Sequence, residues 1–167
     1  SDIQVDGSNK KWVSTSNNGV FYFGEDGTEE IHHFTAENSP LLSNNVIDIA
    51  IEDETGFVYF STDKGLISFK GNATRGGETF SKVYAYPNPV RPGYRGLIFI
   101  TGLVTNAQMK ITDLSGNLVY EGNAEGGQAQ WDGSNFSGER VKSGVYLVFL
   151  TNDDGSETEM TKILIVN

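Results

Sequence analysis

The residue types that most often carry chemistry are few in this chain and poorly placed for it. It contains 2 histidines, His32 and His33, and no cysteine. Neighbouring residues of a β-strand point to opposite faces, so these two imidazoles cannot hold one ion together. A Ser-His-Asp triad would need one of them, and no G-x-S-x-G turn is present to display the serine. We therefore predict no catalytic residue and no metal site, and hence a protein that is not an enzyme.

Acidic clusters at residues 25–30, 52–54 and 153–157 offer oxygen ligands, but none follows the twelve-residue calcium loop with its closing glutamate. Asp-Gly pairs in reverse turns explain them equally well. The pairs Gly76-Gly77 and Gly126-Gly127 lack the helix and lysine of a phosphate-binding loop. We predict no cofactor.

The bulk composition narrows the classes of partner. The 167 residues carry 22 Asp and Glu against 12 Lys and Arg, for a net charge of −10. Such a surface repels phosphate backbones and anionic lipid, so nucleic-acid binding is not expected. Apolar runs reach only strand length, so no membrane span is predicted. The chain opens within an apparent strand, and we expect it to be the C-terminal piece of a longer protein.

The elements of the C-terminal half are short strands. Alternating or apolar runs occur at residues 97–101, 108–112, 117–120, 145–150 and 162–166, with Gly, Asp and Asn turns between them. This spacing predicts an antiparallel β-sandwich. Residues 145–150 are apolar on both faces, which predicts a central strand. Residues 163–166 predict a final strand, and any exposed edge of that strand would be ready for strand addition.

The first half contains an internal repeat. An interval of 47 residues separates Asp6 from Asp53 and Thr15 from Thr62, and each threonine is followed by a polar turn and a Gly-led apolar strand. A period in the forties is the size of one propeller blade. Residues 46–51 are apolar at nearly every position and predict the buried inner strand of the second blade. The repeat motif consists of Asp6, Trp12, Thr15, Gly19, Asp53, Tyr59, Thr62 and Gly65.

These residues resemble the two-component regulator propeller repeat, and Trp12-Val13-Ser14-Thr15 with Asn17-Asn18-Gly19-Val20 is close to its pattern. The resemblance implies that residues 1–78 are two blades, the C-terminal part of a larger propeller. Two blades are too few to close a ring. The polar, Gly-rich stretch at residues 71–78 predicts the boundary to the next domain.

Residues 83–167 resemble the C-terminal sorting domain of type IX secretion. The resemblance rests on Tyr86-Pro87-Asn88-Pro89-Val90, on the hairpin at residues 111–119, on Trp131-Asp132-Gly133 and on residues 138–146 and 162–166 in that order. It implies that residues 79–167 form an immunoglobulin-like antiparallel β-sandwich. The partner-binding residues it implies are Pro87, Asn88, Pro89, Gly144, Val145, Tyr146, Lys162, Ile163, Leu164, Ile165 and Val166.

An all-β chain of propeller-type repeats followed by this domain resembles the surface components of type IX secretion. That resemblance implies a location at the cell surface or outer membrane. The partners it implies are the outer-membrane translocon or attachment-complex proteins, with the sortase and lipopolysaccharide among them. The alternative is a secreted cargo, carbohydrate-active or glycan-binding, whose C-terminal domain is an export signal. A periplasmic ligand sensor is a third reading, which would require a following membrane span and kinase.

Overall fold

The computed structural model describes residues 1–167 and consists of β-strands and turns, with no helix. The prediction of an all-β chain is confirmed. Two compact units follow one another along the chain, Ser1–Arg75 and Gly76–Asn167. Since there is no helix, none is long and apolar enough to cross a membrane.

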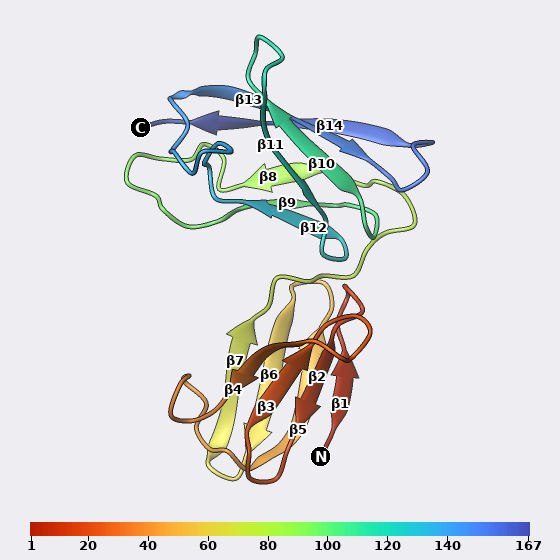
Figure 1. The fold of residues 1–167 in the computed structure, drawn as a ribbon, viewed down its shortest axis with the longest axis vertical. Coiled ribbons are helices and arrows are strands. Elements are labelled where there is room, and N and C mark those ends of the chain that lie inside the picture. Colours follow the sequence, from red (N-terminus) through yellow and green to blue (C-terminus); the bar gives the residue numbers. More distant parts are fainter. The chain divides into compact units, whose positions relative to one another are not determined.

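The first unit contains two antiparallel sheets (Figure 1). The strand order is β1-β2-β3-β4 in one sheet and β5-β6-β7 in the other. The strands are β1 (Ile3–Val5), β2 (Lys11–Ser14), β3 (Val20–Phe23), β4 (Glu30–Phe34), β5 (Val46–Glu52), β6 (Phe57–Thr62) and β7 (Gly65–Lys70).

Aromatic side chains fill the space between these two sheets. The ring centroid of Trp12 lies 4.1 Å from that of Tyr22, 5.7 Å from Phe34, and 5.8 Å from both Phe60 and Phe69. Large buried rings in such offset or tilted contacts contribute more than their area alone. Trp12 is therefore the centre of the first unit's core, and it is fully buried.

Strand β5 is less buried than its sequence predicts. Val46 and Ile49 are buried, but Ile47 between them is 58% exposed. The strand lies at the edge of its sheet, and only one of its faces packs on the first sheet. The prediction that residues 46–51 are buried throughout is therefore wrong for this chain.

The second unit also has two antiparallel sheets, with no closed barrel (Figure 1). One has the order β11-β10-β13-β14 and the other β12-β9-β8. The strands are β8 (Tyr84–Tyr86), β9 (Ile98–Thr101), β10 (Gln108–Thr112), β11 (Leu118–Asn123), β12 (Gln128–Trp131), β13 (Gly144–Thr151) and β14 (Thr158–Ile165). Strand β13 pairs with β10 and with β14, which confirms that it is central.

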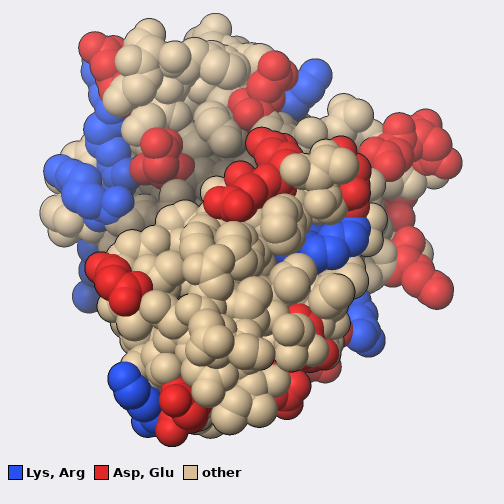
Figure 2. All heavy atoms as spheres, turned by 60° about the horizontal axis from the view of Figure 1, so that its bottom comes forward, with Lys and Arg blue, Asp and Glu red and all other residues tan.

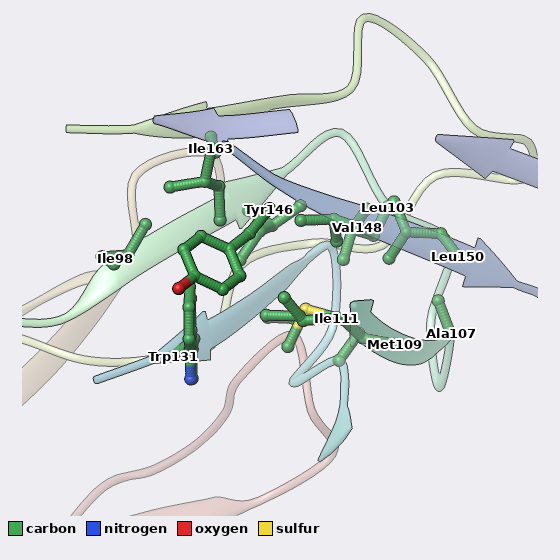
Figure 3. Packing of buried hydrophobic residues seen from close by; sticks show 14 of the residues in the cluster. Ile98, Leu103, Ala107, Met109, Ile111, Trp131, Tyr146, Val148, Leu150 and Ile163 are labelled. Atoms are coloured by element: carbon green, nitrogen blue, oxygen red, sulfur yellow. The ribbon is translucent and has the colours of Figure 1, made fainter. Parts of the chain in front are cut away.

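Side chains from both sheets meet in one core (Figure 3). Trp131 of β12 and Tyr146 of β13 lie with ring centroids 5.6 Å apart, and Trp131 Nε1–H donates to Ser134 O at 2.8 Å. Met109 and Ile111 of β10 point into this core, whereas Lys110 between them is exposed. This alternation agrees with the sequence pattern, because successive side chains of a strand point to opposite faces.

Within the polar stretch at residues 71–78, residues 71–75 belong to the first unit and residues 76–78 to the second. Ala73 and Thr74 are buried in the first unit, where a Cβ on Gly7 would lie 2.0 Å from Thr74 O. Gly77 N–H donates to Leu103 O within the second unit. Glycine has no Cβ and so allows backbones to approach this closely. A Gly-rich composition by itself does not distinguish a packed segment from a flexible linker.

Candidate docking site

Two of the three stretches predicted to bind a partner lie side by side in one hairpin. In the β13–β14 pair, Gly144 lies opposite Ile165 and Tyr146 opposite Ile163. Tyr146, Ile163 and Ile165 are buried, so they belong to the core of the second unit. What this hairpin offers to a partner is its other face and its outer edge.

The third stretch lies on that outer edge. Asn88 Nδ2–H donates to Lys162 O at 2.9 Å, and Leu164 N–H donates to Asn88 Oδ1 at 3.0 Å. The carboxamide of one side chain thus makes the donor and acceptor pair that a neighbouring strand would make with its backbone.

Val90 continues the same pairing through its backbone. Its N–H donates to Leu164 O at 2.8 Å, and Val166 N–H donates to Val90 O at 2.9 Å. Val90 itself is fully buried. The edge of residues 162–166 is therefore occupied by residues 88–90 and is not open for strand addition. The pattern could not reveal this, because the covering segment is distant in sequence and pairs partly through a side chain.

The remaining groups of this region are held by the chain itself. Tyr146 O–H donates to Lys142 O at 2.8 Å. Burial raises the pKa of the Tyr146 phenol, and the negative charge of Asp113 adds to the effect. Asn167 Nδ2–H donates to Val141 O at 2.8 Å, so the last residue is also bonded to the unit. The side chains left exposed by this arrangement are Asn88, Pro89, Lys162, Leu164 and Val166.

The first half of the β14 edge is a feature that the sequence did not predict. Strand β14 begins at Thr158, four residues before the predicted strand. Only β13 pairs with it there. The polar residues Thr158, Glu159 and Thr161 concealed the strand, although their alternation with Met160 is a weak signal.

In the first unit, the repeat motif makes equivalent turns. Thr15 Oγ1–H donates to Gly19 O at 2.9 Å, and Thr62 Oγ1–H donates to Gly65 O at 2.8 Å. Each hydroxyl also accepts a backbone N–H of its turn. Both glycines have positive φ, and a Cβ on Gly19 would lie 2.0 Å from Phe34 O. These four residues close the two hairpins.

The two aspartates of the motif differ in role. Asp6 is buried, and its carboxylate accepts from Trp12 Nε1–H at 3.1 Å, from Tyr22 O–H at 2.9 Å and from Ser8 Oγ–H at 2.8 Å. Asp53 instead forms an ion pair with the exposed Arg75. The motif aromatics differ in the same way, since Trp12 is buried and Tyr59 is half-buried.

No group of catalytic side chains comes together in either unit. His33 stacks on Phe21 with centroids 4.0 Å apart, and His32 contacts Phe34 on the opposite face of the sheet. No three His, Asp or Glu side chains gather as metal ligands would. Acidic side chains lie scattered over the visible surface in Figure 2. The features of the two units that a partner could contact are therefore exposed faces and strand edges.

Comparison with known proteins gives a matching family and a similar solved structure. The family described as "Secretion system C-terminal sorting domain" matches residues 84–167. No curated protein matches the chain. Among solved structures, PorZ of Porphyromonas gingivalis, described as an essential bacterial surface component of the type-IX secretion system, is 36% identical with a TM-score of 0.66.

That match covers 99% of this chain and 22% of the PorZ chain, so the chain spans about a fifth of the length of PorZ. Dimeric latent PorU from the same organism is 18% identical with a TM-score of 0.39, covering 70% of this chain and 13% of PorU. That likeness is too low to carry an argument. The sorting-domain match extends over half of the chain. It includes strand β14 and residues 88–90, the edge-covering segment. The chain belongs to the family of secretion system C-terminal sorting domain proteins.

Proposed function

We propose that the chain is a non-enzymatic surface component of type IX secretion, which docks the cargo-attachment machinery through its β-domains. The observation that carries the proposal is the 36% identity to a type-IX surface component over 99% of this chain, together with a sorting domain at its C-terminal end. Its partners would be translocon or attachment-complex proteins, the sortase and lipopolysaccharide among them. Its place would be the cell surface or outer membrane.

We further propose that residues 1–78 are two propeller-type repeats of a larger array. The face of the first sheet that carries Trp12 packs on the face of the second sheet that carries Phe60. Tyr59 stands at the repeat position of Trp12, on the face of the second sheet that no strand of this chain covers. Leu66 on that face is 68% exposed. A repeat array stacks opposite faces of equivalent units head to tail in this way, and each added repeat covers the previous one.

For residues 79–167 we propose an immunoglobulin-like sandwich that presents the edge-covering segment and β14 to a partner. The two sheets with one core between them support this architecture. The exposed side chains Pro89, Leu164 and Val166 are the contacts that such a partner would reach without unfolding the unit.

Gene deletion tests the proposed role directly. Loss of a surface component should remove many unrelated cargo proteins from the cell surface. The measurement is therefore the amount of other cargo proteins on the cell surface. If instead the other cargo remains attached and only this protein is missing, the chain is cargo whose sorting domain serves its own export.

Point substitutions test the docking surface. Leu164→Ser and Val166→Ser change exposed side chains and leave the buried Ile163 and Ile165 intact, unlike deletion of residues 162–167. We expect reduced cargo attachment with normal levels of folded protein. Leu118→Ser is the matched control, because Leu118 lies on the opposite edge strand of the same sheet. The exposure of the two side chains is similar, 44% for Leu118 and 38% for Leu164. Equal effects of Leu118→Ser and Leu164→Ser would contradict this placement of the surface.

A further inference from the structure

The outer edge of β14 consists of two halves that differ in occupancy. In the β13–β14 hairpin, Asn152 N–H donates to Glu157 O, so odd-numbered residues of β14 point their backbone groups to β13. Even-numbered residues point theirs outward, as the bonds of Leu164 and Val166 to Val90 demonstrate. Residues 162–166 are covered by residues 88–90, whereas no strand pairs with the outward side of Thr158 or Met160.

The uncovered half retains the groups that a further strand would use. The N–H and C=O of Thr158 and the C=O of Met160 point outward, and Met160 N–H donates to the carboxylate of Glu159 at 3.0 Å. Unpaired strand edges of this kind are templates for β-addition. The covered half demonstrates that this edge accepts an extended segment.

Beside this edge lies an open hollow whose lining is mixed, with Thr151, Thr158 and Glu159 beside apolar residues. Phe149 and Met160 are opposite each other across β13 and β14 and line it, and they are 42% and 53% exposed. Alternate side chains of an added strand fall on the same face as these two residues. Apolar residues at every second position of the added strand would therefore continue this face.

The charges around the open half are mainly negative. Asp153, Asp154, Glu157 and Glu159 lie in the β13–β14 turn and at the start of β14, and the Glu157 carboxylate accepts from Phe80 N–H at 3.1 Å. Lys110 lies opposite Phe149 on β10, and the nearest lysine of β14, Lys162, lies at the covered half. The Asp154 pKa is lowered by hydrogen bonds from Ser156, so this carboxylate is charged at neutral pH. A second copy of the same edge would bring these carboxylates against each other, which is unfavourable. A basic strand would be attracted instead.

We infer that residues 158–161 bind an extended basic peptide segment by β-addition, in which lysine or arginine alternates with apolar residues. The inference deepens the proposed function, on which it rests, by naming the chemistry of a docked partner.

The test uses purified chain and the probe peptide acetyl-Lys-Val-Lys-Val-Lys-Val-amide, followed by NMR amide exchange. We expect saturating peptide to slow exchange of the outward Thr158 amide at least tenfold, with no change at the Leu164 amide. A peptide of the same charge with N-methylated backbone should give no protection, because it cannot pair. Equal protection by the N-methylated peptide, or none by the probe, would overturn the inference.

Two variants give independent readings. Thr158→Pro removes an outward donor without touching the β13 ladder, and we expect it to abolish peptide binding. Asp153→Asn with Glu159→Gln should weaken binding about tenfold, whereas Glu121→Gln with Glu139→Gln removes the same charge elsewhere on the unit and should not. Equal weakening by both charge pairs would show non-specific attraction and overturn the site.

Sedimentation of the chain alone completes the test. We expect a monomer, and a concentration-dependent dimer that protects Thr158 would mean that the edge pairs with itself. These results are read from purified chain and the gene deletion is read from cargo on cells, so failure of one is distinguishable from failure of the other.

Discussion

In the second unit, 18 buried hydrophobic residues form one cluster between two sheets, whereas the corresponding cluster of the first unit contains only eight. Both units leave large apolar residues exposed, among them Ile3, Val5 and Leu66 in the first and Leu114 and Phe136 in the second. What differs is the buried core, which is the larger in the second unit. For the first unit we have proposed that its exposed face stacks on a further repeat. The comparison teaches that two all-β units of one chain can have different degrees of self-sufficiency.

The strongest test of this comparison removes the central tryptophan of each unit. Trp131→Ala should destabilise the second unit by about 3–5 kcal/mol, the usual cost of deleting a buried ring. Trp12→Ala carries a similar cost in a smaller core, so we expect the first unit to unfold while the second stays folded. Hydrogen exchange with mass spectrometry reads the two units separately. Unfolding of both units by either substitution would contradict their independence.

The second test concerns the aspartates at repeat positions 6 and 53. Asp6→Ala removes the acceptor of Trp12 Nε1–H and Tyr22 O–H. About 2–3 kcal/mol of stability should be lost, because these donors then have no hydrogen-bond acceptor. Asp53→Ala removes an exposed ion pair with Arg75, worth about 0.5 kcal/mol. Urea unfolding of the two variants measures both. Similar losses would mean that the aspartates have the same role after all.

The third test separates the two halves of the β14 edge. Asn88→Ala deletes both side-chain bonds to β14 and should cost about 1–2 kcal/mol. The Leu164 amide should then exchange faster, while the already open Thr158 amide stays unchanged. Asn117→Ala is the control, because it deletes the hydrogen bond from the Asn117 side-chain amide to Asp113 in an exposed turn. Unchanged exchange at Leu164 would show that Val90 alone covers the edge.

The smallest effect compares one turn from each unit. Hydrogen bonds from Thr28 lower the pKa of Asp26 in the first unit, and those from Asn117 lower the pKa of Asp113 in the second. A depressed carboxyl pKa contributes stability above the ordinary aspartate range, and the contribution is lost as pH falls through the folded value. Amide shifts of Thr28 and Ser115 should therefore titrate with midpoints below that range. A midpoint at the ordinary value would mean that the turn is open in solution.

The sequence predicted the strands wherever alternation and turns agreed. Strand β10 has the predicted bounds, and Asp113 closes the following turn with bonds to Ser115 and Asn117. Strand β12 was missed because Gln128 and Gln130 interrupt the pattern. Gln128 is nevertheless buried, and its Oε1 accepts from Tyr86 O–H at 3.2 Å. A tertiary hydrogen bond of this kind leaves no periodic signal.

The candidate site was less predictable than the fold. Its residues came from resemblance, and the structure brings Asn88, Gly144–Tyr146 and residues 162–166 together. That Asn88 acts as a substitute for a strand residue depends on a contact across 76 positions, for which no local pattern exists. Whether these residues bind a partner stays a prediction.

The same contact has a consequence for how the second unit is made. Asn88 leaves the ribosome long before Leu164, so its two bonds must wait until nearly the whole unit has been synthesised. Contacts between such distant residues form late and slowly. Residues 88–90 can therefore pair only after β14 has been synthesised. In a nascent chain, or in one shortened before β14, that segment would remain unpaired.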